Sequence, residues 1–303
     1  MPAPARICAL VAAHERPWHT EKALDSLFDA ASRARVDVEV ILADSSRDSR
    51  TAEVVRAKPE SITFLKVAAN CFWACAMRRA SEEASSREWD YLLWLNDDVE
   101  LHPDALLRIV SLARRTEGRA LVAGTLVDPR DGLRSYGIGR LGPWYRRLHL
   151  SQVQPTTPWS EGHVANGNVL LLPRQITDQL GCFPDGFFHN QADIAFSLSA
   201  WKAGWRVVTP GEPVGLCVKS PDWDLTSTID IGPLGPIGRS GNPKGLRLSE
   251  WIPFALKFGG VFGFLFAFSP VFVGIFSRAR SRRGRPSVPP GQDDSSLDLR
   301  RMP

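Results

Sequence analysis

An apolar run that stops at Asn96, Asp97 and Asp98 constrains the fold of this chain more than any other segment. The run, YLLWL at residues 91–95, lacks the alternation of a half-exposed strand, so it predicts a strand buried on both faces of a parallel sheet. Ligands of open α/β sheets bind beyond the carboxyl ends of the strands, which is where the two carboxylates follow. Carboxylates so placed favour Mg²⁺ or Mn²⁺, because these ions select oxygen ligands. The alternative is a polar turn before the helix start at 102–104.

Strand-like and helix-like segments alternate along residues 7–127. This alternation predicts an α/β fold with a mainly parallel, doubly wound sheet. A chain of 303 residues, 44% of them hydrophobic, is long enough for one large domain and an appendage. The strands are expected at 7–12, 36–43, 62–67, 91–95 and 120–127, and the helices at 20–32, 51–57, 72–85 and 103–115.

Polar residues follow three of the predicted strands, at 14–16, 44–46 and 96–98. Because the carboxyl ends of parallel strands meet at one edge of a sheet, these residues predict a polar crevice of the size of a nucleotide. The first strand is not followed by GxGxxG, and the chain has no GxxxxGK[ST] motif. Rossmann dehydrogenases and P-loop NTPases are therefore poor fits.

The positive charge of the chain is concentrated near its C-terminal end. The formal net charge is +4, and the rest of the chain is close to neutral once the five clustered arginines are set aside. This distribution argues against a nucleic-acid-binding face, so no nucleic-acid partner is expected. The arginines are Arg278, Arg280, Arg282, Arg283 and Arg285.

The cysteines and the N-terminus predict a cytoplasmic protein. The five cysteines are odd in number and form no CxxC pair, which favours a reducing compartment and argues against a disulfide framework or a zinc site. No secretory signal is visible, because the chain passes directly from its first residues into a predicted strand.

The second half of the chain contains a further candidate site residue, Asp193. Residues 128–157 are rich in Gly, Pro and Arg and predict a long loop or a pair of short hairpins. A strand and a short helix, 174–180, are expected next, and then a helix that carries Asp193 in its first turn. The helix dipole there favours an ionised carboxylate, which suits a general base. The alternative is a residue that only caps the helix.

Six motifs, taken in order, resemble those of the family 2 glycosyltransferases, which have the GT-A fold. The resemblance extends over about residues 5–275 and is greatest to the branch that builds bacterial surface polysaccharides, with rhamnosyl- and galactofuranosyltransferases. It implies an inverting transfer of a sugar from a UDP- or dTDP-linked donor to a hydroxyl of a glycan or lipid-linked acceptor. The motifs are His14-Glu15-Arg16, Asp44-Ser45-Ser46-Arg47-Asp48, Asn70-Cys71-Phe72-Trp73, Asn96-Asp97-Asp98, Asn166-Gly167-Asn168, and the helix opening with His189 and Asp193 before Ala203-Gly204-Trp205.

The resemblance also implies a role for each of these residues. Asp98 would bind a metal ion, Mg²⁺ or Mn²⁺, that bridges the two phosphates and neutralises the leaving nucleoside diphosphate. Asp193 would deprotonate the acceptor hydroxyl. The nucleotide sugar would contact Arg16, Asp44, Asn70, Trp73, Asn96 and Asp97, with Asp44 at the base or ribose, and the acceptor side would include Asn166, Gly167 and His189.

Four positions depart from the family pattern. Ala43 and Ala195 stand where carboxylates are frequent, Ala74 stands in a stretch that is otherwise Gly-rich, and Cys217 lies near the place of a second metal-binding histidine. These departures leave open a degenerate member that binds glycan or nucleotide as a scaffold. A nucleotidyltransferase is a poorer alternative, because residues 14–17 supply no Gly-rich loop with Lys or Arg.

Residues 258–276 form an apolar run of 19 residues without a charge, which is long enough for one transmembrane helix. A single span would place the catalytic domain away from nucleotide sugars, and Pro270 interrupts the run. We therefore expect a broken helical hairpin against the inner face of the cell membrane or against the domain, with the arginines drawn to anionic lipid. The alternative is a pair of core helices. The expected parts are a GT-A domain at 1–235, an apolar helical appendage at 236–280 and a disordered tail at 281–303.

Overall fold

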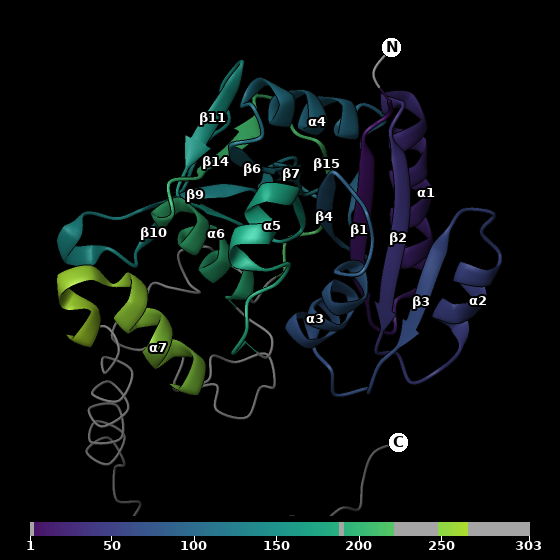
Figure 1. Ribbon diagram of the computed structural model, residues 1–303, viewed down its shortest axis with the longest axis horizontal. Helices are drawn as coiled ribbons and strands as arrows, with labels where there is room; N and C mark the ends of the chain where they lie inside the picture. The colour runs from purple at the N-terminus through teal and green to yellow at the C-terminus, as the bar shows by residue number, and fades with distance from the viewer. Residues whose placement is uncertain (1–2, 188–190, 221–247, 266–303) are drawn as a thin grey trace, which may run out of the picture.

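The computed structural model describes residues 3–187, 191–220 and 248–265 (Figure 1). Its centre is an eight-stranded sheet with the strand order β11 (Trp159–Gly162), β14 (Arg206–Pro210), β6 (Ala120–Ala123), β13 (Val169–Pro173), β4 (Tyr91–Asn96), β1 (Arg6–Ala13), β2 (Asp37–Asp44) and β3 (Ile62–Lys66). β3, β2, β1 and β4 are parallel neighbours, whereas β13 is antiparallel to β4 and β6, and β11 is antiparallel to β14. The mainly parallel α/β sheet that the sequence predicted is confirmed.

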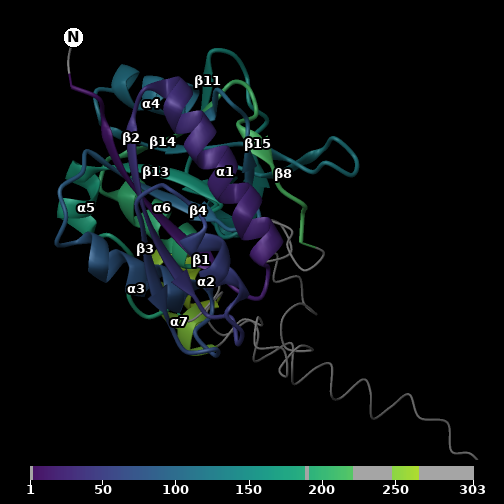
Figure 2. The same cartoon turned by 90° about the vertical axis from the view of Figure 1, so that its right-hand side faces the viewer.

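Helices cover both faces of the sheet (Figure 2). They are α1 (Pro17–Ala34), α2 (Arg50–Arg56), α3 (Trp73–Ala84), α4 (Ala105–Arg115), α5 (Arg174–Leu180) and α6 (Ala192–Lys202). Leu27 of α1 packs in one apolar cluster with Leu93 of β4, and Met77 of α3 packs in another with Trp94. Successive residues of a strand point to opposite faces, so β4 is apolar along its length because each of its faces meets a helix layer.

The strand register brings the three polar segments to one edge of the sheet, as predicted. Ala13 at the end of β1 is opposite Asp44 at the end of β2. On the other side of β1, Ala12 is opposite Asn96 at the end of β4. The residues that follow these three strands are therefore neighbours in space.

The strand expected at 120–127 is two strands, because the chain leaves the main sheet at Gly124. A Cβ at position 124 would lie 2.3 Å from Val214 and 3.0 Å from Val169, so only glycine fits between them. Smaller sheets follow, and the hairpins β7–β8 and β9–β10 confirm the expectation of short hairpins within 128–157. Their strands are β5 (Glu100–Leu101), β7 (Leu126–Val127), β8 (Arg134–Tyr136), β9 (Ile138–Leu141), β10 (Leu150–Gln152), β12 (Val164–Ala165) and β15 (Gly215–Leu216).

The described C-terminal residues pack on the domain. α7 (Leu248–Phe258) places Trp251, Phe254 and Phe258 in an apolar cluster with Ile194 and Leu198 of α6. A short 3₁₀ helix, η3 (Gly260–Phe262), follows. Within the described residues, no helix is long and apolar enough to cross a membrane. The remainder of the apolar run, 266–276, and the tail expected at 281–303 lie outside these residues.

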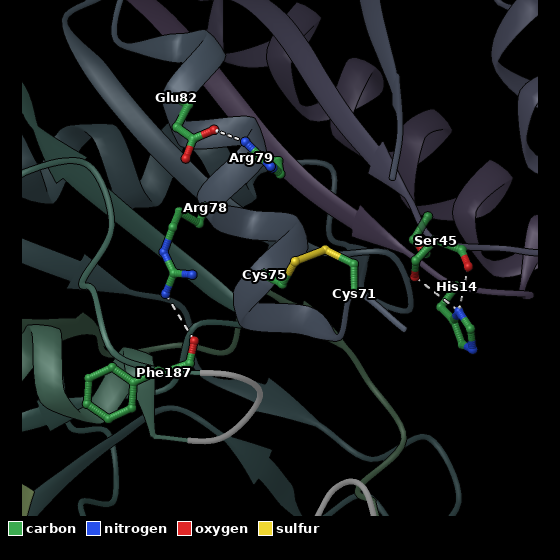
Figure 3. The surroundings of a disulfide bond; sticks show 9 residues. His14, Ser45, Cys71, Cys75, Arg78, Arg79, Glu82 and Phe187 are labelled. Carbon is green, nitrogen blue, oxygen red and sulfur yellow. Dashed lines mark hydrogen bonds and ion pairs between the residues drawn. A yellow bond between two sulfur atoms is a disulfide. The ribbon is translucent and has the colours of Figure 1, made fainter. Parts of the chain in front are cut away.

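The expectation that the cysteines form no disulfide is wrong. Cys71 and Cys75 are joined at the start of α3, with Sγ atoms 2.02 Å apart (Figure 3). Cys71 lies two residues before α3 and Cys75 in the first turn of that helix, a spacing of four residues that differs from a CxxC pair. Cys8, Cys182 and Cys217 are free thiols.

Candidate active site

Arg16 joins the ends of β1 and β4. Its guanidinium donates one hydrogen bond to Asp98 Oδ2 at 2.6 Å and another to Asp97 Oδ1. The Arg16 side chain is half-exposed, whereas that of Asp97 is buried. Together with His14, Asp44 and Ser45, these three residues form the strand-end cluster.

Asp97 lies beneath Arg16 at the end of β4. Its side chain is 1% exposed, and Thr20 Oγ1 and the backbone N–H of His14 approach Oδ2, each at 3.4 Å. Burial raises the pKa of Asp97 to about 7, although the nearby guanidinium of Arg16 opposes this rise. Asp97 is therefore placed to hold Arg16 rather than to touch a ligand directly, and its predicted contact with the nucleotide sugar stays a prediction.

Asp44 is fully buried, and both of its carboxylate oxygens have protein partners. Oδ1 accepts the N–H of Ser46 at 2.9 Å, and Oδ2 accepts Lys66 Nζ at 2.8 Å. His14 completes this side of the edge, with Nδ1 3.0 Å from Ser45 Oγ (Figure 3). Lys66 of β3 was not predicted as a site residue. Of the ion pair that it forms with Asp44, only the Lys66 side chain is exposed to solvent.

Asp98 is the most accessible carboxylate of the strand-end cluster, with 25% of its side chain exposed. The Cys217 thiol lies 3.7 Å from its Oδ1, and burial raises the pKa of that thiol, so the sulfur is protonated and a poor ligand for Mg²⁺. Among the described residues, no group of three His, Cys, Asp or Glu side chains forms a metal site. Mg²⁺ is commonly held by one or two carboxylates together with substrate phosphates. Asp98 therefore fits a metal ion whose shell a bound diphosphate completes.

Trp73 lies between the strand-end cluster and α6. Its Nε1 donates to Asn96 Oδ1 at 2.7 Å, and its ring packs edge-on against Trp94. A Cβ at Gly167 would lie 2.8 Å from the Trp73 ring and 3.2 Å from the Cβ of Asp193. Glycine at 167 thus permits this close approach, and the indole and Asp193 are neighbours across it.

Asp193 is in the first turn of α6, as predicted, and is 8% exposed. Oδ2 accepts the N–H of Gly167 at 2.8 Å, and Oδ1 accepts the N–H of Ile194 at 2.9 Å. Burial raises the pKa of Asp193 and outweighs these two hydrogen bonds, which the sequence argument from the helix dipole did not foresee. Gln191 occupies the N-cap position, so Asp193 is not the capping residue.

Two buried amides near Asp193 have unsatisfied polar atoms. Asn166 is 4% exposed and Gln191 is 1% exposed. Asn166 Oδ1 accepts the N–H of Gly137 at 3.2 Å, but its Nδ2 has no partner among the described residues, and neither has Gln191 Nε2 or Oε1. Buried polar atoms are normally paired, so these atoms mark a place for a polar partner. With Gly167 and Asp193, the two amides form the α6 cluster.

The comparison with known families decides the class of this arrangement. A model described as glycosyl transferase family 2 matches residues 8–174, from β1 to the start of α5. This chain belongs to that family. It is a glycosyltransferase, and the resemblance found in its motifs is confirmed.

Two further relatives agree with this assignment. The N-acetylglucosaminyl-diphospho-decaprenol L-rhamnosyltransferase of Mycobacterium tuberculosis is 27% identical over 215 residues, which cover 63% of this chain and 68% of the relative. The mannosyltransferase PcManGT from Pyrobaculum calidifontis, solved in complex with GDP-Man and Mn²⁺, matches with a TM-score of 0.52 and 17% identity over 93% of this chain and 76% of that one. The second likeness shows the fold alone and supports the GT-A assignment.

Two predicted site residues, Asn70 and His189, and three of the departures from the family pattern remain to be placed. Asn70 is exposed in the turn before α3, and His189 lies outside the described residues. Ala43, Ala74 and Ala195 are all buried. Ala195 packs in the cluster with α7, where a carboxylate would be buried against apolar side chains.

Arg78 is a residue of α3 that the sequence did not point to. Its Nη2 donates to the carbonyl of Phe187 at 3.0 Å (Figure 3). The same nitrogen lies 3.4 Å from the carbonyl of Pro184. Its Nε also lies 3.4 Å from Asp185. Arg78 therefore fixes the segment that precedes α6, a contact across distant parts of the chain with no local sequence signal.

Proposed function

We propose that this glycosyltransferase moves a sugar from a nucleoside-diphosphate sugar to an acceptor hydroxyl with inversion at the anomeric carbon. The approach of both Trp73 and Asp193 to Gly167 carries the proposal, because Trp73 also bonds Asn96 beside the strand-end cluster and so links the two polar clusters. The strand-end cluster would hold the nucleoside diphosphate, and the α6 cluster would hold the acceptor.

Asp193 is the proposed general base. Its carboxylate would take the proton of the acceptor hydroxyl while that oxygen bonds to the anomeric carbon, and the bond to the nucleoside diphosphate would break on the opposite face. The raised pKa of Asp193 supports this role, because it makes the carboxylate a stronger base above that pKa. A single displacement at one carbon inverts its configuration.

The negative charge of the diphosphate is proposed to be neutralised at the edge of the sheet by Arg16, by Lys66 and by a metal ion that Asp98 would hold. A bound Mg²⁺ or Mn²⁺, held by Asp98, would supply positive charge to the leaving group, and the Mn²⁺ of PcManGT supports this expectation. The guanidinium of Arg16 suits phosphate oxygens because of its planar donor geometry. Asp97 and Asp44 are buried beneath these cations and would hold them in place.

The acceptor is proposed to be a glycan or a lipid-linked sugar at the inner face of the cell membrane, and the donor a UDP- or dTDP-sugar. The name of the mycobacterial relative supports a lipid-linked sugar acceptor. The amide atoms of Asn166 and Gln191 that find no partner among residues 3–187, 191–220 and 248–265 also support a sugar, because amides pair with hydroxyl and acetamido groups as both donors and acceptors.

Nucleoside diphosphate release from UDP-, dTDP- and GDP-sugars tests this proposal. The full chain would be assayed with a synthetic prenyl-diphospho-sugar acceptor, with Mn²⁺, with Mg²⁺ and with EDTA. We expect release from one donor that requires metal and acceptor, and an inverted anomer by NMR. A retained anomer would contradict the mechanism, and full activity in EDTA would contradict the metal role.

A degenerate binding protein is the second candidate, and two contacts of Asp98 favour it. Arg16 already pairs with Asp98 Oδ2, and Cys217 faces Oδ1, so the carboxylate proposed for the metal is engaged on both sides. In that case a nucleotide would bind, with an affinity measurable by calorimetry, but no donor would be turned over in the presence of the acceptor.

A further inference from the structure

Exposed large apolar side chains lie on two distant segments that one ring stack joins. Trp144 and Tyr145 lie in η1 (Trp144–Arg146), between β9 and β10, and are 64% and 55% exposed. Val261 and Leu265, in and after η3, are 84% and 59% exposed. The rings of Trp144 and Phe262 stack, with centroids 5.5 Å apart and planes at 22°. Figure 1 shows this hairpin tip beside the yellow-green end of the described chain. Together these five residues form the aromatic face.

Cationic side chains border the aromatic face. Arg147 lies over the ring of Trp201 at 5.7 Å, and its Cδ would be 3.1 Å from a Cβ at Gly260. Lys202 and Lys257 both lie over the ring of Phe258, at 5.1 Å and 5.2 Å. Burial and the charges of Arg147 and Lys257 lower the pKa of Lys202, so the three cations are close enough to repel one another. An anion next to them would relieve that repulsion.

The sequence that follows this face is also apolar and then basic. Residues 266–276, which follow Leu265 directly, are FAFSPVFVGIF and carry no charge. Five arginines follow between positions 278 and 285. The chain therefore supplies more apolar side chains and more cations at the point where the aromatic face ends.

We propose that the aromatic face docks on an anionic lipid bilayer. Soluble proteins rarely expose large contiguous apolar patches without a partner. Trp and Tyr sit well at the boundary between headgroups and acyl chains, because their rings are apolar and their N–H and O–H groups are polar. Bordering Lys and Arg side chains are attracted to anionic headgroups. A protein partner would not account for the long apolar and then basic sequence that continues from the face.

The position of the aromatic face suggests how docking would serve sugar transfer, an inference that rests on the proposed function. α7 leads into the aromatic face and packs along α6, and α6 begins next to Asp193. A docked bilayer would thus be separated from the proposed base by α6. An acceptor sugar anchored by a lipid would be presented to the α6 cluster from that side.

Vesicle binding of the full chain tests the docking without any turnover. Partition would be measured by sedimentation with vesicles of phosphatidylglycerol and phosphatidylcholine in equal parts, and with phosphatidylcholine alone. We expect binding to the anionic vesicles that weakens at high salt. The double variant Trp144→Ala, Val261→Ser should lower the partition coefficient about tenfold, because it removes exposed apolar area that inserts at the interface. Lys257→Gln should lower it about threefold, since each basic residue contributes a similar small attraction.

The chain offers matched controls on α1. Trp18 is 65% exposed, with Lys22 Nζ 5.2 Å above its ring, so it repeats the chemistry of the aromatic face at another place. Trp18→Ala and Lys22→Gln should change the partition coefficient less than twofold. Circular dichroism and nucleotide binding would check that every variant is folded.

Hydrogen exchange in the presence of vesicles locates the contact. We expect protection of residues 142–148 and 256–265 and none around Trp18. Equal partition of the double variant and the unmodified chain would overturn the proposal, as would protection confined to residues beyond 265. Equal binding to neutral vesicles, or a dimer that the double variant abolishes, would also overturn it. The vesicle experiments contain no donor or acceptor, so they test docking independently of catalysis. A protein that docks but transfers no sugar would contradict the proposed function and leave the docking proposal standing.

Discussion

Trp73 links the strand-end cluster to the α6 cluster, because its Nε1 bonds Asn96 and its ring lies against Gly167. The carboxylates of the two clusters are held in different ways. Arg16 binds Asp97 and Asp98, and Lys66 binds Asp44, so the first cluster pairs each carboxylate with a cation. In the second cluster, backbone N–H groups of Gly167 and Ile194 hold Asp193.

In the proposed mechanism, this difference separates the residues that bind charge from the residue that transfers a proton. A carboxylate covered by a guanidinium fixes that cation at the edge of the sheet, where a diphosphate can use it. Burial raises the pKa of Asp193 as it does that of Asp97, but the hydrogen-bond partners of Asp193 are backbone N–H groups and no cation among the described residues covers it, so it would be the carboxylate able to take a proton from a substrate. In the proposed mechanism, the same residue type would therefore have two different roles in one site, according to what surrounds it.

The largest effect is expected for Asp193→Asn. Asparagine keeps the shape of the side chain and an oxygen for the N–H of Gly167, but it has no carboxylate to accept a proton. The rate of transfer should fall about a thousandfold, as is typical when a general base is lost. Steady-state assays with saturating donor and acceptor would measure this, and unchanged donor affinity would show that the first cluster is intact.

The pH profile sharpens the test of Asp193. Because burial raises its pKa, activity should fall as the pH drops through a value above the ordinary range of Asp, and Asp193→Asn should lose this acidic limb. Asp178→Asn is the matched control, since Asp178 is an exposed carboxylate on α5. A residual acidic limb in Asp193→Asn would assign the base elsewhere.

The sequence predicted the first cluster better than the second for a physical reason. Each strand and the polar residues after it are contiguous, so the motifs at 14–16, 44–46 and 96–98 were visible as local patterns. The amide of Gln191, which has no hydrogen-bond partner within the described part of the chain, depends instead on segments that come together only through tertiary packing. α7 likewise turned out to cover α6 with Trp251, a contact that no local pattern encodes.

The next largest effect is expected for Arg16→Gln on stability. Removing one partner of a fully buried ion pair costs roughly 3–5 kcal/mol, and the half-exposed Arg16 reduces this to about 2 kcal/mol. The pKa of Asp97, already raised from 3.8 to about 7, should rise further without the guanidinium. Native Asp97 then keeps a proton that the unfolded chain releases, so the stability of the variant should fall as the pH rises through and beyond neutrality.

Urea unfolding at about pH 5 and about pH 9 measures this effect. The stability lost in Arg16→Gln should be larger at the higher pH. Arg33→Gln is the control, because Arg33 forms an exposed pair with Asp29 one turn away on α1, and its loss should cost less than about 0.5 kcal/mol. A loss in Arg16→Gln that does not depend on pH would show that the guanidinium has no effect on the pKa of Asp97.

The smallest effect is expected for Arg78→Met, which probes the second cluster from outside. Arg78 holds the carbonyls of Pro184 and Phe187, just before the chain turns into α6. Loss of these bonds should shift the base slightly and lower kcat about tenfold, less than the roughly hundredfold that a misplacement of 1 Å can cost. The KM for the donor should not change, because the strand-end cluster is untouched.

Arg79→Met provides the comparison for Arg78→Met. Arg79 is the next residue on α3, is exposed, and pairs with Glu82 on its own helix at 2.9 Å (Figure 3). Its loss should leave both kcat and KM unchanged. If Arg78→Met raised the donor KM and spared kcat, α3 would act on the strand-end cluster through Trp73 rather than on α6. In that case α3 would position the residues that bind charge as well as the proposed base. The helices could then not be assigned to one cluster or the other.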